Sequence, residues 1–118
     1  MCFLYFVLTT ERNNNMIEIT DANFNDNVLA SDKLAVVDFY TPWCAPCKKM
    51  LSTLNYISEE RDDVNFFKIN AEENVNTVRD YSVSGVPIVL LFKNGTIVKK
   101  VVGLFSKDSL IKTIEKHL

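Results

Sequence analysis

The sequence has few cysteines and no excess of positive charge. Its 118 residues include three cysteines, whereas a secreted domain framed by disulfides would have more, in even number and spread along the chain. This cysteine usage indicates a reducing compartment. The formal net charge of -2 argues against a nucleic-acid or anionic-membrane surface, because both need clustered lysine and arginine. With 47% hydrophobic and 24% charged residues and no repeat, the chain fits a single globular domain.

The first fifteen residues lack the features of a targeting or membrane segment. The apolar stretch Cys2–Leu8 has seven residues, whereas a helix that spans a membrane needs about 20. No lysine or arginine precedes it, and Thr9–Arg12 follows where a signal peptide would have a small-residue cleavage site. We therefore expect residues 1–15 to be a disordered extension or a start-site artefact, and the domain to span residues 16–118. A weak export or anchoring signal stays open as the alternative.

From Met16 onward, apolar runs alternate with amphipathic stretches. The runs predict five strands, at residues 16–19, 34–40, 64–69, 88–92 and 96–102. The amphipathic stretches predict four helices, which begin after Thr20 or Asp21, at Cys47, at Asn74 and after Ser106. Early strand–helix–strand units favour parallel pairing, and Asn94-Gly95 predicts a hairpin that adds antiparallel strands. The predicted fold class is α/β, with a five-stranded mixed sheet flanked by helices on both faces.

Two of the cysteines lie where a predicted buried strand gives way to a helix. Cys44 opens the helix, where unpaired backbone N–H groups and about half a positive charge favour the thiolate and lower its pKa. Cys47 follows one turn later and is expected to lie deeper. This placement predicts that Cys44 attacks a disulfide and that Cys47 resolves the mixed disulfide. Pro46 is tolerated there, because a first-turn residue needs no N–H.

Two other interpretations of this cysteine pair are a zinc site and an inert thiol pair. Zinc needs four ligands, and the only other candidates, Cys2 and His117, lie at opposite ends of the chain. An inert pair is disfavoured because a strand-to-helix junction activates a cysteine. Neither alternative is favoured by the residues.

The residues around the pair resemble the thioredoxin family. Trp43-Cys44-Ala45-Pro46-Cys47-Lys48 after Val37–Tyr40 is similar to the family's active site and its preceding strand. Further features follow in the family's order, namely a proline loop at Gly85-Val86-Pro87, a hairpin at Phe92–Gly95 and a groove glycine at Gly103. The resemblance covers residues 16–118 and implies a thioredoxin fold. Ala45 departs from the family's usual glycine.

The resemblance implies catalytic roles for four residues. Cys44 and Cys47 match the redox-active pair, and Asp38 matches the buried carboxylate behind the second cysteine. An isolated carboxyl in an apolar run should have a raised pKa, so that it can take a proton from Cys47 and return it. A solvated aspartate at the end of the strand is the alternative. Lys68 matches a lysine that approaches this carboxylate, although an outward-facing strand lysine is an alternative.

The resemblance also implies a substrate-binding surface. Trp43 matches an aromatic residue that shields the dithiol, although a core tryptophan is an alternative. Pro87 matches a cis-proline opposite Cys44, with an ordinary trans loop proline as the alternative. Next to that proline, the backbone of Val86 can pair with an extended substrate segment. The remaining residues expected on this surface are Ala45, Pro46 and Gly103.

The function that the resemblance implies is reduction of protein disulfides by dithiol exchange. No bound cofactor is expected beyond the redox-active disulfide Cys44–Cys47 itself. The expected partners are disulfide-containing proteins and an NADPH-dependent thioredoxin reductase, and the protein is expected to be a cytoplasmic monomer without nucleic-acid or membrane partners. Two alternatives stay open: an exported or membrane-tethered exchange protein, and a binding module of the same fold that does not use its cysteines.

Overall fold

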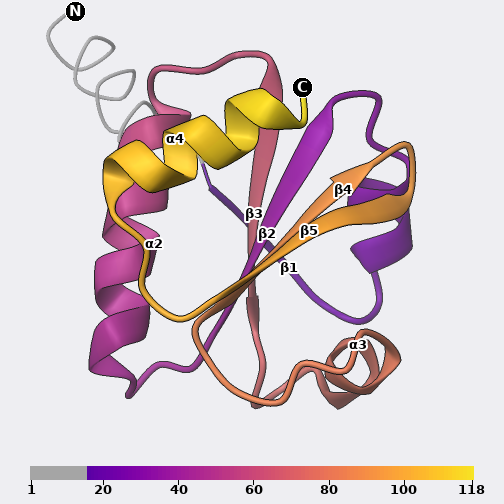
Figure 1. Ribbon diagram of the computed structural model, residues 1–118. Helices are drawn as coiled ribbons and strands as arrows, with labels where there is room; N and C mark the ends of the chain where they lie inside the picture. The colour runs from indigo at the N-terminus through magenta and orange to yellow at the C-terminus, as the bar shows by residue number, and fades with distance from the viewer. Residues whose placement is uncertain (1–15) are drawn as a thin grey trace, which may run out of the picture.

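The computed structural model describes residues 16–118, and a twisted five-stranded sheet forms the centre of this part of the chain (Figure 1). The strands are β1 (Ile17–Ile19), β2 (Leu34–Tyr40), β3 (Val64–Asn70), β4 (Ile88–Lys93) and β5 (Thr96–Val102). The helices are the π-helix η1 (Asn25–Leu29) and the α-helices α2 (Ala45–Ser58), α3 (Val75–Asp80) and α4 (Lys107–Lys116). The predicted strands and helices are therefore all present, with bounds that differ by at most a few residues. The expectation for residues 1–15 lies outside the described residues.

The sheet is mixed, as the sequence pattern predicts. Its strand order is β1-β3-β2-β4-β5, with β3 parallel to both β1 and β2 and with antiparallel pairing of β4 to β2 and β5. The β4–β5 hairpin turns at Asn94 and Gly95, whose φ angles are 54° and 80°. Asn and Gly tolerate this left-handed backbone better than other residues, so the dipeptide gives a tight turn.

Each face of the sheet carries its own hydrophobic cluster. On one face, Val36 and Phe66 pack with Met50 and Leu54 of α2 and with Ile114 of α4. The second cluster, on the opposite face, includes Ile19, Phe24, Val28, Phe39 and Phe92. In Figure 1, α2 and α4 lie together on one side of the sheet and α3 lies on the other. The central strand β2 is thus buried on both faces, which explains an apolar sequence that only Asp38 interrupts.

The segment before η1 differs from the prediction. The sequence predicts a helix capped by Thr20 or Asp21, but the structure has a short π-helix that starts after Phe24 and lacks a side-chain cap. The Asp21 carboxylate instead accepts hydrogen bonds from the backbone N–H groups of Asn76 and Thr77 (3.3 and 3.0 Å) and from the Thr77 hydroxyl (2.6 Å). The first amides of α3 have no partner within the helix, and a carboxylate is a strong acceptor for them. Asp21 therefore caps α3, a helix more than fifty residues away.

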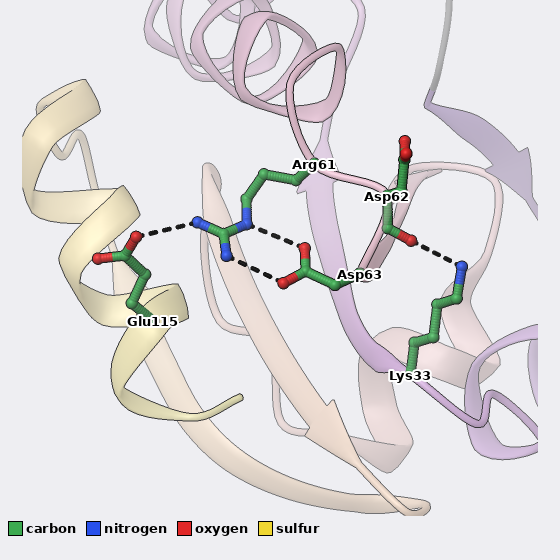
Figure 2. A network of polar contacts seen from close by, with 5 residues as sticks. All are labelled: Lys33, Arg61, Asp62, Asp63 and Glu115. Atoms are coloured by element: carbon green, nitrogen blue, oxygen red, sulfur yellow. Dashed lines mark hydrogen bonds and ion pairs between the residues drawn. The ribbon is translucent and has the colours of Figure 1, made fainter.

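A polar network closes the end of the fold far from Cys44 (Figure 2). Arg61, which follows α2, donates to both oxygens of Asp63 at 3.0 and 3.1 Å and to Glu115 of α4 at 3.1 Å. Lys33 donates to the carbonyl oxygen of Asp62 at 2.7 Å. Fourteen residues of helix, about 21 Å, separate this network from the N-terminus of α2. The network links the segment after α2 to α4, and it makes no contact with the cysteine end of α2.

Candidate active site

Cys44 and Cys47 form a disulfide at the N-terminus of α2. Cys44 is the N-cap residue in an extended conformation, and its Sγ accepts a hydrogen bond from the Cys47 N–H at 3.2 Å. Pro46 lies in the first turn, as expected. Cys47 is fully buried, whereas Cys44 has 9% of its surface exposed, so the first cysteine is the more accessible of the two, although it is less open than predicted.

Trp43 lies beside the pair and is exposed. It has 70% of its surface in solvent, which excludes the alternative of a core tryptophan. Its indole Nε1–H donates to the Glu72 carboxylate at 2.9 Å. Sequence reasoning missed Glu72, although the parallel register of Tyr40 with Asn70 places the residues after β2 next to those after β3. The backbone bond from Ala71 N–H to the Tyr40 carbonyl, at 2.8 Å, continues this pairing into the site.

Asp38 is a fully buried carboxyl on the face of β2 that α2 covers. Leu34 and Val36, four and two residues earlier on the same face of β2, pack against α2, and Cys47 shares the buried side of that helix with Met50. Among the described residues, neither oxygen of Asp38 has a hydrogen-bond partner. Burial raises the pKa of Asp38 well above its usual range, and the positive charge of Lys68 opposes this rise only in part. The predicted direction of this pKa shift is confirmed.

Lys68 does not pair closely with Asp38. It is aligned with Asp38 across the β2–β3 pair and with Glu18 across the β1–β3 pair. Its Nζ lies 4.0 Å from Glu18 Oε1, at the limit of an ion pair. Glu18 also accepts from the Tyr40 hydroxyl, at 2.7 and 2.9 Å to its two oxygens. Sequence reasoning missed Glu18, because no strand pairing could be assigned to β1 from its three residues.

The loop before β4 lies at the same end of the sheet. The Val86–Pro87 peptide bond is cis, as the resemblance implies. Ile88 is aligned with Phe39, so Pro87 lies beside the end of β2 from which the chain runs to Cys44. Gly103, with φ of 86°, donates its N–H to the Pro87 carbonyl at 3.0 Å. A hollow of about 230 Å³, lined in part by Thr41, Glu72 and Val86, opens next to this loop.

Comparison with known proteins gives a consistent result. The thioredoxin family model matches residues 15–116. The chain belongs to the thioredoxin family. Thioredoxin of Rickettsia typhi is 40% identical over 101 residues, which cover 85% of this chain and 96% of that protein. Thioredoxin of Staphylococcus saprophyticus is 38% identical over 104 residues (87% and 98%), and that of Synechocystis sp. is 37% identical over 102 residues (86% and 95%).

As a member of the thioredoxin family, the protein is a thiol–disulfide oxidoreductase, and the Cys44–Cys47 disulfide is its redox-active group. The family acts as a disulfide reductase without a bound cofactor, and it implies disulfide-containing substrates and thioredoxin reductase as partners. Within residues 16–118, His, Cys, Asp and Glu form no group of three or more that could hold a metal ion. The same part of the chain contains no helix long and apolar enough to cross a membrane.

Proposed function

We propose that the protein reduces disulfides of other cytoplasmic proteins as a monomer, with Cys44 as the attacking and Cys47 as the resolving cysteine. The observation that carries this order is the backbone N–H of Cys47, which points at Cys44 Sγ from 3.2 Å at the start of α2. A hydrogen-bond donor and the positive end of a helix both favour a thiolate on Cys44 once the disulfide is reduced. Cys47 is fully buried and cannot meet a large substrate first.

In the first step, the Cys44 thiolate attacks one sulfur of a substrate disulfide. A bond forms between Cys44 Sγ and that sulfur, and the other substrate sulfur leaves as a thiolate that takes a proton from solvent. The mixed disulfide holds the substrate next to Trp43 and the loop at Val86.

In the second step, Cys47 resolves the mixed disulfide. Its thiol loses a proton, its sulfur attacks Cys44 Sγ, and the substrate sulfur leaves as a second thiolate. Two electrons have then passed to the substrate, and Cys44 and Cys47 form a disulfide. We assign the proton of Cys47 to Asp38, which shares the buried space between β2 and α2 and whose raised pKa makes it a stronger base than an ordinary carboxylate. Lys68 moderates this pKa by its charge.

The substrate segment is assigned to the surface around Trp43 and the Val86–Pro87 loop. Trp43 offers an exposed apolar face, and Ala45 and Pro46 are also exposed beside Cys44. The backbone of Val86 would pair with an extended segment by strand addition, and the Gly103 bond to Pro87 would hold that loop in place. This mode selects for an accessible disulfide rather than for a sequence.

Reduction of a model disulfide protein by dithiothreitol tests the catalytic proposal. We expect wild type and Cys2→Ser to accelerate the reaction equally and Cys44→Ser to lose the acceleration. Cys47→Ser should accumulate mixed disulfides with its substrates, because the attack remains and the resolution does not. If Cys44→Ser is as fast as wild type, the attacking role of Cys44 is wrong. If neither wild type nor any variant accelerates reduction, the binding-module alternative is supported instead.

Regeneration and location need separate measurements. We propose that an NADPH-dependent thioredoxin reductase returns the disulfide to the dithiol, so NADPH oxidation should continue as long as substrate is present, and NADH should not replace it. Sedimentation should give a single species of about 13.5 kDa. Fractionation of cells that express the chain from Met1 should place it in the soluble cytoplasm. Recovery in the membrane or outside the cell would support the tethered or exported alternative.

A further inference from the structure

One row of side chains crosses the sheet behind the dithiol and contains a carboxylate that the mechanism above does not use. Glu18, Lys68 and Asp38 are aligned on the adjacent strands β1, β3 and β2. All three lie on the sheet face that α2 covers, because each alternates with residues of the opposite cluster, such as Ile19 and Phe67. Lys68 therefore stands between two carboxyl groups, with a backbone spacing of about 5 Å to each strand.

The two carboxyl groups differ in environment. Asp38 is fully buried and has no hydrogen-bond partner among the described residues. The Glu18 side chain is 46% exposed, and both of its oxygens accept from the Tyr40 hydroxyl at 2.7 and 2.9 Å. Tyr40 lies two residues after Asp38 on the same strand, and its hydroxyl holds the Glu18 carboxylate in place beside Lys68. The Lys68 ammonium, on a flexible stem that is 28% exposed, lies 4.0 Å from this carboxylate.

We infer that Glu18 is a positioning residue of the redox site: held by the Tyr40 hydroxyl, its carboxylate keeps the Lys68 ammonium away from Asp38 and thereby preserves the proton affinity of the buried carboxyl. The inference rests on the proposed role of Asp38 as the proton acceptor of Cys47. Its physical basis is that the attraction between Lys68 and Asp38 grows as their separation falls, most of all in the buried space around Asp38. A closer ammonium would favour the ionised carboxylate and make it a weaker base.

Few other charged or titratable groups face Asp38. Val89 of β4 is its apolar neighbour on the other side. On the α2 side, Cys47 does not titrate in the disulfide form. Tyr40 is its neighbour on β2, and burial together with the Glu18 hydrogen bond raises the pKa of Tyr40, so its hydroxyl stays a donor at neutral pH. Glu73 acts on Tyr40 by charge alone. Lys68 is thus the one cation whose position Glu18 can change near Asp38 within residues 16–118.

Titration of the Asp38 carboxyl by carbon NMR, in the oxidised protein, tests the inference without turnover. Glu18→Gln keeps an acceptor for Tyr40 but removes the charge, and we expect it to lower the pKa of Asp38 by about one unit. Tyr40→Phe keeps the charge but releases the carboxylate, and a smaller shift in the same direction is expected. Glu60→Gln, at the other end of α2, is the matched control and should leave the titration unchanged.

The same substitution in a Lys68→Met protein separates an action through Lys68 from direct repulsion between the Glu18 and Asp38 carboxylates. If Glu18 acts through Lys68, Glu18→Gln should shift the Asp38 titration much less in Lys68→Met than in wild type. An equal shift in both backgrounds, or no shift in wild type, overturns the inference.

Kinetics link this titration to the reaction. Dithiobis(nitrobenzoate) reports the second step: Cys44 forms a mixed disulfide with thionitrobenzoate, and Cys47 then displaces the coloured thionitrobenzoate. We expect Glu18→Gln to move the acid limb of this step to lower pH by the same amount as the NMR titration. Asp38→Asn in the same assay tests the proposed function: if it resolves as fast as wild type at every pH, the proton-acceptor role fails. If Asp38→Asn is slow but Glu18→Gln matches wild type, only the inference about Glu18 fails.

Discussion

The buried carboxyl of Asp38 makes the stability of the oxidised protein depend on pH in an unusual direction. Its pKa is raised in the folded protein by burial, so the folded state binds a proton that the unfolded chain releases near its ordinary pKa of about 3.9. Between these two pKa values, folding requires proton uptake. The contribution of Asp38 to stability is therefore complete below the unfolded pKa and is lost as the pH rises toward the folded pKa.

The magnitude follows from a single proton. While the folded protein holds it and the unfolded chain does not, the free energy of unfolding falls by about 1.4 kcal/mol per pH unit. Above the folded pKa the loss levels off at the cost of an unpaired buried charge, which is on the order of several kcal/mol. Lys68 reduces that cost by its charge.

Asp38→Asn removes this proton with almost no change of shape, so it isolates the effect. Urea unfolding of both oxidised proteins from pH 4 upward should show that the variant gains stability relative to wild type, with a slope of up to about 1.4 kcal/mol per pH unit. Other groups whose pKa values shift on folding, such as Asp21, contribute equally in both proteins and cancel in the difference. Parallel stability curves would show that Asp38 titrates alike in the folded and unfolded chain, and the argument from burial would then be wrong.

Three further changes probe the fold that carries the site. Asp21→Ala should cost about 1–2 kcal/mol of stability, because the amides of α3 lose their acceptor. Burial opposes the shift, but hydrogen bonds from Thr77 lower the pKa of Asp21, so the cost should shrink as the pH falls through that pKa. An unchanged urea midpoint would contradict the cap. Leu54→Ala should cost about 2–5 kcal/mol by leaving a cavity under α2, and a loss below 1 kcal/mol would mean that the helix collapses onto the sheet. Arg61→Met should cost about 1 kcal/mol or less, because its partners, among them Glu115, are half exposed; a cost that does not fall with added salt would refute its ionic origin.

The sequence predicted those parts of the fold that depend on local patterns. The strand bounds 34–40 and 96–102 match the structure, because a buried apolar run and an Asn-Gly turn are signals within a few residues of chain. The Ser106 cap is confirmed for the same reason, since its hydroxyl accepts from the Ser109 N–H three residues away.

Contacts between distant segments could not be predicted. The cap of α3 by Asp21 and the bond from Trp43 to Glu72 join residues that are 56 and 29 positions apart. Their recognition requires the strand register, and one residue of slip would move each side chain to the other face. Lys68 shows the same limit: the resemblance placed it near Asp38, but its partner Glu18 belongs to a three-residue edge strand whose pairing the sequence leaves open.

The Cys44–Cys47 disulfide closes a loop of only three positions along the chain. A crosslink that short removes little freedom from an unfolded polypeptide, so it adds little to the stability that the sheet and the two hydrophobic clusters provide. We therefore expect the reduced and the oxidised protein to share one scaffold. A reductase selects the oxidised form and a substrate the reduced form, so with a shared scaffold their selection would depend on the two sulfur atoms and the residues next to them.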